Sequence, residues 1–194
     1  SKTVINECRK ISKEISKEDI ETRRDFRDLN FVTIDGSNAK DFDDAVYAEE
    51  LSDGFRLYVA IADVSAYVTK DSQLDKEAFS RATSVYFEKK VIPMLPELIS
   101  NQLCSLRPNE DKLVLTCEIY LDNRGEIKDF EFFNSVICSK NRLTYDEVEK
   151  FYQKGQTALL DDAVNNLRVL KKIHSLRRKI RKDRKAIDFY LPEY

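Results

Sequence analysis

Residues 31–46, FVTIDGSNAKDFDDAV, place four aspartates between two apolar segments. The aspartates are Asp35, Asp41, Asp43 and Asp44. The flanking segments FVTID and DAVYAEEL are rich in β-branched and aromatic residues, which is typical of strands. The polar segment GSNAK between them starts with glycine and is predicted to be a loop. The fold must therefore gather the carboxylates at one end of a sheet, close to a hydrophobic core.

Such a cluster needs compensation, because two carboxylates ~4 Å apart repel by about 4 kcal/mol at an effective dielectric of 20. Cations or raised pKa values can supply it. Ligation by carboxylate oxygens suits Mg²⁺ or Mn²⁺, and Mg²⁺ commonly shares its shell with substrate phosphates. If DFDD is extended, Asp41 and Asp43 share a face and Phe42 points into the core. The pattern predicts a metal site for phosphoryl chemistry.

A calcium-binding EF-hand loop would also be rich in acidic residues, but it needs Gly at its sixth and Glu at its twelfth position. Counted from Asp41 those positions hold Val46 and Ser52, and counted from Asp35 they hold Lys40 and Val46. The EF-hand is therefore excluded in both registers. A solvated acidic loop stays open as the alternative to a metal site, because charge runs are usually exposed to water.

The rest of the chain alternates predicted strands and short helices. Strands are predicted at 55–68, 113–121 and 127–137, the last two joined by the turn DNRG. Helices are predicted at 71–82 and from Tyr145, where Thr144 and Glu147 have capping-box spacing; residues 91–99 are predicted to be a loop. These elements predict an α+β fold, a mainly antiparallel sheet with packed helices. Residues 1–30 are predicted to be a charged helical lead-in, and 31–194 the domain proper.

Positive charge is concentrated late in the chain. The formal net charge is −2, yet residues 168–185 hold ten Lys or Arg and one Asp. Apolar residues recur there at mostly three- or four-residue steps, which predicts an amphipathic helix with a basic outer face: Leu160, Val164, Leu167, Leu170, Ile173 and Ile180. That face is either solvated or in contact with nucleic-acid phosphates. His174 is expected to be a surface side chain.

Composition excludes several classes of protein. No run approaches the roughly 20 apolar residues of a membrane span, and the first residues, SKTVINECRK, do not form a signal peptide. The four cysteines are far apart without a CxxC pair, which argues against a zinc site or a disulfide framework. We therefore expect a cytoplasmic protein without a membrane partner.

Several blocks, in order, resemble the RNB catalytic domain of the ribonuclease II and ribonuclease R family of bacterial exoribonucleases. The blocks are TIDGSNAKDFDDAV, LYVAIADVSAYV, IPMLPELISNQLCSLRP, RLTYDEV and AIDFYLPEY. Within the family, TIDGSNAKDFDDAV and VYFEKKVIPMLPE are more similar to the ribonuclease R branch. Where the family often has His, this chain has Ala66, and Tyr190 stands where Asp is usual.

The resemblance implies a processive 3′-to-5′ exoribonuclease that releases nucleoside 5′-monophosphates from the 3′ end of single-stranded RNA. It assigns the four aspartates to a two-magnesium site, with Asp43 the most critical and Mn²⁺ a possible substitute. It matches Tyr86 to a tyrosine that stacks on bases and Tyr145 to one that holds the terminal nucleotide near the metals. Without the resemblance, Tyr86 would be interpreted as a half-buried aromatic and Tyr145 as an ordinary packing residue.

The resemblance also implies that part of the domain is missing. The family's domain continues with a segment that supplies a catalytic arginine and a glutamate, and cold-shock and S1 domains flank it. We therefore expect an incomplete RNB catalytic domain that self-associates through uncovered apolar surface and is weakly active or inactive alone. The alternative is a noncatalytic RNA-binding module on the same scaffold. Asp63 is expected to anchor a turn, and Arg107 is expected to form a salt bridge or contact phosphate. Neither residue is assigned to catalysis.

Overall fold

A computed structural model describes residues 2–12, 14–87, 90–155 and 161–187. Its helices are α1 (Lys2–Cys8), α2 (Lys17–Glu21), α3 (Gln73–Arg81), α4 (Tyr145–Lys154) and α5 (Asp161–Asp183), with a 3₁₀ turn η1 (Val64–Ala66) and a π turn η2 (Ile99–Leu103). Its strands are β1 (Arg24–Asp25), β2 (Val32–Asp35), β3 (Asp44–Leu51), β4 (Gly54–Ala62), β5 (Val85–Phe87), β6 (Lys90–Ile92), β7 (Asp111–Asp122), β8 (Ile127–Cys138) and β9 (Asn141–Thr144).

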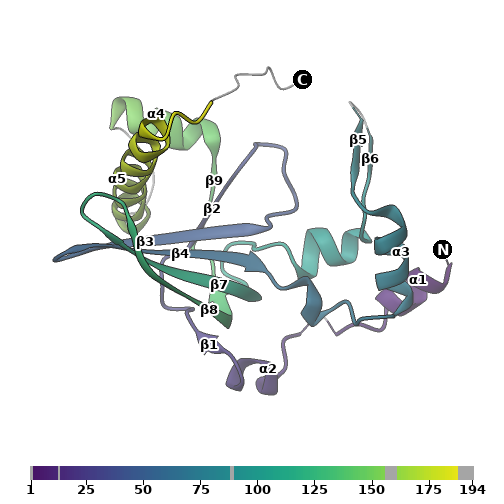
Figure 1. The fold of residues 1–194 in the computed structure, drawn as a ribbon. Coiled ribbons are helices and arrows are strands. Elements are labelled where there is room, and N and C mark those ends of the chain that lie inside the picture. The colour runs from purple at the N-terminus through teal and green to yellow at the C-terminus, as the bar shows by residue number, and fades with distance from the viewer. Residues whose placement is uncertain (1, 13, 88–89, 156–160, 188–194) are drawn as a thin grey trace.

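A seven-stranded sheet organises the fold, in the order β1-β8-β7-β4-β3-β2-β9. The five central strands pair antiparallel, while β1 and β9 add parallel pairs at the two edges. Strands β5 and β6 form a separate hairpin, which projects from the body of the protein beside α3 (Figure 1). The predicted α+β class with a mainly antiparallel sheet is confirmed.

Two groups of helices pack around this sheet, α4 with α5 and α1 with α3 (Figure 1). Helices α4 and α5 pack on one face, where Val164, Leu167 and Ile173 of α5 are buried against β2, β3 and β4. Helices α1 and α3 and the π turn pack on the other face. The amphipathic helix predicted from the spacing of apolar residues is confirmed, although Leu160 lies outside the described residues.

Local sequence signals are confirmed at two more places. Gly125 turns the β7–β8 hairpin with φ +82°, a left-handed conformation that favours glycine. The Thr144 hydroxyl accepts a hydrogen bond from the Glu147 amide, and the Glu147 carboxylate accepts one from the Thr144 amide, so α4 starts at Tyr145. Both elements were specified by a few neighbouring residues.

Three predictions of secondary structure need correction. The strand expected over 55–68 ends at Ala62, because the Asp63 carboxylate accepts hydrogen bonds from Ser65 and Ala66 and starts the η1 turn. The loop predicted at 91–99 contains the end of β6 and the start of the π turn. The lead-in is less peripheral than expected, because β1 pairs with β8 and the core includes Val4, Cys8 and Phe26. The domain boundary at residues 30 and 31 stays a prediction.

Two absences concern the part of the chain that the structure describes. None of its helices is both long and apolar enough to pass through a bilayer. Its four cysteines carry no disulfide: Cys8 and Cys104 are buried, and Cys117 and Cys138 are partly exposed.

Candidate active site

Strands β2 and β3 separate where the aspartates begin. Their ladder consists of one pair, Val32 opposite Val46, and continuing that register would place Asp35 opposite Asp43. Instead β2 pairs along its whole length with β9, so Asp35 lies beside Thr144. Asp43 lies next to β4, since its carbonyl accepts a hydrogen bond from the Ala62 amide at 2.9 Å. The loop 36–42 connects these two anchored ends.

Phe42 fixes the far end of that loop. Its side chain is only 8% exposed and packs in the main core. Its amide donates to the Ser105 hydroxyl at 3.1 Å, and its carbonyl accepts from the Leu106 amide at 2.8 Å. The Ser105 hydroxyl donates in turn to the carbonyl of Lys40 at 2.9 Å. The prediction that Phe42 points into the core is confirmed, and the burial leaves its neighbour Asp43 on the surface.

The carboxylates influence one another electrostatically. Burial raises the pKa of Asp35, and the charge of Asp44 raises it further, while Arg142 opposes the shift; Asp41 and Asp43 also raise it. Burial likewise raises the pKa of Asp43, followed by the charges of Asp41 and Asp44. Protein atoms around Asp43 therefore remove part of its hydration even though its side chain reaches solvent. A divalent cation would relieve this accumulated charge.

The donor set fits a hard metal ion chemically, because it consists of carboxylate oxygens. Among the described residues no partner hydrogen-bonds to Oδ2 of Asp35, which is buried and so retains a lone pair for a ligand. The geometry is not preassembled, however. Within residues 2–12, 14–87, 90–155 and 161–187, no three His, Cys, Asp or Glu side chains are grouped closely enough to hold a metal ion. The four aspartates therefore influence one another's charge without forming a closed set of ligands.

Tyr145 lies next to this acidic site. As the first residue of α4 it directly follows Thr144, the residue that pairs with Asp35. Its side chain is 64% exposed. It also borders an open pocket between α4 and α5 that Tyr152 and Lys171 help to line. The strand register thus places Tyr145 directly after the residue that pairs with Asp35, and its role in holding a nucleotide stays a prediction.

Tyr86 belongs to a different structural unit. It lies in β5 of the separate two-stranded sheet, and its side chain is 68% exposed. The interpretation of Tyr86 as a half-buried aromatic is therefore wrong. An exposed ring on a projecting hairpin is suited to stacking on a planar ligand.

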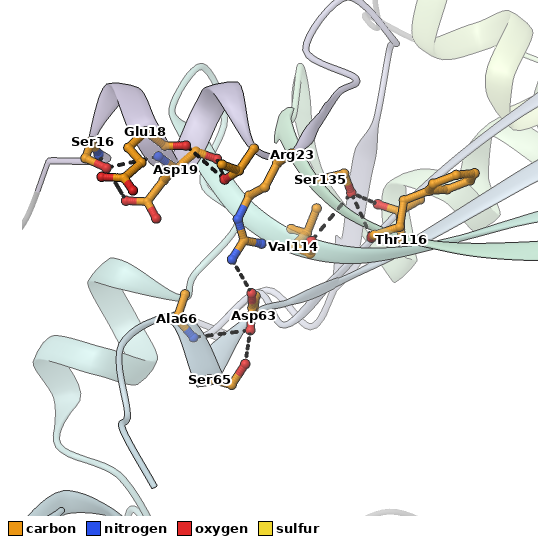
Figure 2. A network of polar contacts seen from close by, with 12 residues as sticks. Ser16, Glu18, Asp19, Arg23, Asp63, Ser65, Ala66, Val114, Thr116 and Ser135 are labelled. Carbon is orange, nitrogen blue, oxygen red and sulfur yellow. Dashed lines mark hydrogen bonds and ion pairs between the residues drawn. The ribbon is translucent and has the colours of Figure 1, made fainter.

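Asp63 anchors the end of β4, as expected. Its carboxylate forms an ion pair with Arg23 at 2.7 Å, and both side chains are largely buried (Figure 2). Figure 2 shows this contact joining the segment after α2 to the η1 turn. Asp63 directly follows Ala62, whose amide donates to the carbonyl of Asp43. Arg107 donates to the carbonyl of Asn101 at 2.6 Å, and its suggested phosphate contact stays a prediction.

The basic helix α5 uses part of its charge internally. Lys172 pairs with Glu50 at 2.5 Å, and Arg177 donates to the carbonyl of Gly125 at 2.9 Å. Lys171 donates to the carbonyl of Tyr152 at 3.1 Å. His174 is exposed, as predicted. Solvated face and phosphate contact both remain open for the other basic side chains.

Arg142 is the site residue that sequence reasoning missed. It lies in β9 opposite Thr33, and its Nη2 donates to the carbonyls of Gly36 at 3.0 Å and Ser37 at 2.8 Å. Its guanidinium carbon lies 5.4 Å from the centroid of the Phe42 ring. Nothing in the local sequence RLTYDEV indicates these contacts, because they depend on the pairing of β9 with β2.

Comparison with known proteins adds the family. The RNB domain matches residues 23–194. Ribonuclease R of Acidithiobacillus ferrooxidans is 47% identical over 188 residues, covering 96% of this chain and 43% of that protein. Ribonuclease R of Escherichia coli (strain K12) is 44% identical over 183 residues, covering 92% of this chain and 22% of that protein.

A solved structure has the same fold. Mycoplasma genitalium RNase R in complex with ribose methylated single-stranded RNA matches with a TM-score of 0.93 and 39% identity, covering 100% of this chain and 30% of that chain. This chain therefore spans less than half the length of these relatives. Because the domain match extends over most of its residues, the chain belongs to the RNB domain family.

Proposed function

We propose that this chain carries the acidic half of the active site of a processive 3′-to-5′ exoribonuclease, which hydrolyses RNA to nucleoside 5′-monophosphates. The observation that carries the proposal is that four aspartates between the end of β2 and the start of β3 influence one another electrostatically, while the strand after them in the sheet leads directly into the exposed Tyr145. The family supports it, since the curated relatives are ribonuclease R proteins. The similar Mycoplasma genitalium enzyme has been solved with single-stranded RNA.

In this proposal Asp35, Asp41, Asp43 and Asp44 hold two Mg²⁺ ions, for which Mn²⁺ can substitute. When bound, two such ions activate water and stabilise the leaving oxygen of a phosphodiester. The protein contributes ligand oxygens and their placement. Asp35 offers a buried oxygen at a fixed strand end, and Asp43 offers an exposed carboxylate held next to the core by Phe42.

The two tyrosines bind the RNA at different places. Tyr145 projects from the start of α4 next to Asp35 and holds the terminal nucleotide at the site of hydrolysis. Tyr86 projects from the β5–β6 hairpin and stacks on a base further along the strand. Stacking is insensitive to base identity, so both contacts suit an enzyme that degrades many sequences.

We also propose that the chain by itself hydrolyses RNA weakly or not at all. Phosphoryl transfer depends mainly on positioned charge, and the described carboxylates are not closed around one point. Additional positively charged groups are needed to orient the phosphate. The cytoplasm is the proposed location of the whole enzyme.

A noncatalytic RNA-binding module is the second candidate, with basic helix α5 as its main contact. The exposed basic residues of α5 favour it. The aspartates argue against it, because clustered negative charge repels an RNA backbone unless cations intervene. Removal of divalent metal distinguishes the two candidates. It should abolish the function of the proposed acidic site but change RNA binding through α5 only modestly.

Calorimetric titration with Mn²⁺ or Mg²⁺ tests the proposal, with and without a short single-stranded RNA. We expect binding that RNA strengthens and that Asp43→Asn abolishes. Asp53→Asn is the matched control, because Asp53 is an exposed aspartate in the turn between β3 and β4. Equal titrations of wild type and Asp43→Asn would reject the site. Metal-independent RNA binding that is lost only when α5 is neutralised would favour the second candidate.

A further inference from the structure

Arg142 contacts the aspartate-bearing loop at its beginning. Its Nη2 donates to two successive carbonyls, those of Gly36 and Ser37, immediately after Asp35. These contacts join residues more than 100 positions apart in the chain. Hydrogen bonds from a charged donor are stronger than those from a neutral one, so the two together can fix the direction in which the loop leaves β2.

The same side chain also reaches the end of the loop. Its guanidinium lies over the ring of Phe42, the residue between Asp41 and Asp43. The backbone of Phe42 is held by hydrogen bonds to Ser105 and from Leu106. Arg142 therefore joins the strand end that carries Asp35 to the core anchor of the other aspartates. We propose that Arg142 is a positioning residue that holds the 36–42 loop in place and thereby sets the arrangement of the four carboxylates.

The way Arg142 is bonded supports this role. Some arginines of this chain pair with carboxylates, as Arg27 does with Asp25 and Asp111. Arg142 instead bonds to carbonyls, and the ion pairs found among the described residues include none of the four aspartates. The carboxylate oxygens thus remain available to other ligands while a cation lies close enough to moderate their repulsion.

Lysine is a poor substitute for arginine in this position. Arginine offers a rigid planar group that can stack on an aromatic ring and donate within its plane at the same time. The lysine ammonium is a compact charge on a flexible stem and does not combine the two contacts. The comparison of Arg142→Lys with Arg142→Met therefore separates the contribution of charge from that of shape.

The test measures hydrogen exchange of the backbone amides in residues 36–42, together with Mn²⁺ affinity by calorimetry. Arg142→Met removes both hydrogen bonds to the loop, and the loss of even one bond from a charged donor is worth about tenfold. We therefore expect it to speed exchange in this loop at least about tenfold and to weaken Mn²⁺ binding at least about tenfold. Arg142→Lys should lie between Arg142→Met and wild type. Exchange in β7 and β8 should not change.

Arg27→Met is the matched control, because Arg27 makes ion pairs on the opposite edge of the sheet. It should lower the unfolding temperature without altering the loop or Mn²⁺ binding. The inference would be overturned if hydrogen exchange in residues 36–42 were unchanged in Arg142→Met, or if it were equal in Arg142→Met and Arg27→Met. The expected effect of Arg142 on Mn²⁺ binding rests on the proposed function, because it assumes that the four aspartates bind metal. If wild type bound no Mn²⁺, the proposed site would be rejected, and loop exchange alone would decide the role of Arg142.

Discussion

Replacement of Phe42 by alanine should destabilise the protein and loosen the acidic site together. Truncating a buried phenylalanine typically costs about 3–5 kcal/mol. Phe42 is 8% exposed, and one side of its ring faces the Arg142 guanidinium instead of apolar atoms. We therefore expect a loss near the lower end, about 3 kcal/mol. Against a total stability of roughly 5–15 kcal/mol, that is a large fraction.

Urea unfolding measures this loss directly. With a slope of about 1–3 kcal/mol per molar urea, the midpoint of Phe42→Ala should fall by about 1–3 M. Phe79→Ala makes the same chemical change in α3, where the ring is 88% exposed, and should cost less than about 0.5 kcal/mol. Under native conditions, Phe42→Ala should also weaken Mn²⁺ binding while Phe79→Ala leaves it unchanged.

Two results would refute the reasoning. A loss below about 1 kcal/mol would show that the core does not depend on the ring. A full loss of stability with unchanged Mn²⁺ affinity would show that Phe42 fixes the fold but not the aspartates on either side of it. The second result would also weaken the case for Arg142, since both residues are argued to hold the same loop.

Three further predictions concern charge, stacking and exposed apolar surface. The pKa of Asp43 is raised in the folded state, so its contribution to stability is present at low pH and is lost as the pH rises through that pKa. Without divalent metal, Asp43→Asn should therefore raise the melting temperature more at pH 7 than at pH 4. An equal gain at both pH values would contradict this. Tyr86→Ala should weaken binding of a single-stranded oligonucleotide by about 1–3 kcal/mol in fluorescence anisotropy, and Tyr86→Phe should bind nearly as well as wild type. Equal losses of affinity in Tyr86→Ala and Tyr86→Phe would exclude stacking. Phe130 and Phe132 are 58% and 60% exposed on β8 and should promote self-association. In sedimentation at high protein concentration, the variant with both replaced by serine should have a smaller mass than wild type. A wild type that is monomeric at that concentration would contradict this prediction.

Short-range signals were sufficient for much of the fold. Enrichment in β-branched and aromatic residues indicated β3 and the strands of the β7–β8 hairpin, and a glycine indicated the turn between β7 and β8. Two residues with capping-box spacing placed Tyr145 at the start of α4. Each signal operates within about one turn or one hairpin, so the neighbouring residues already contain the physical cause.

The acidic site depended on both levels. The sequence by itself determined that four carboxylates lie between two strands and that Phe42 is buried beside them. It did not show that β9 pairs with β2, although this pairing brings Tyr145 and Arg142 to the aspartates. It also did not show that Asp63 ends β4 through an ion pair with Arg23. Strand register between distant segments is set by the packing of the whole sheet, and therefore only the tertiary structure decided which side chains surround the carboxylates.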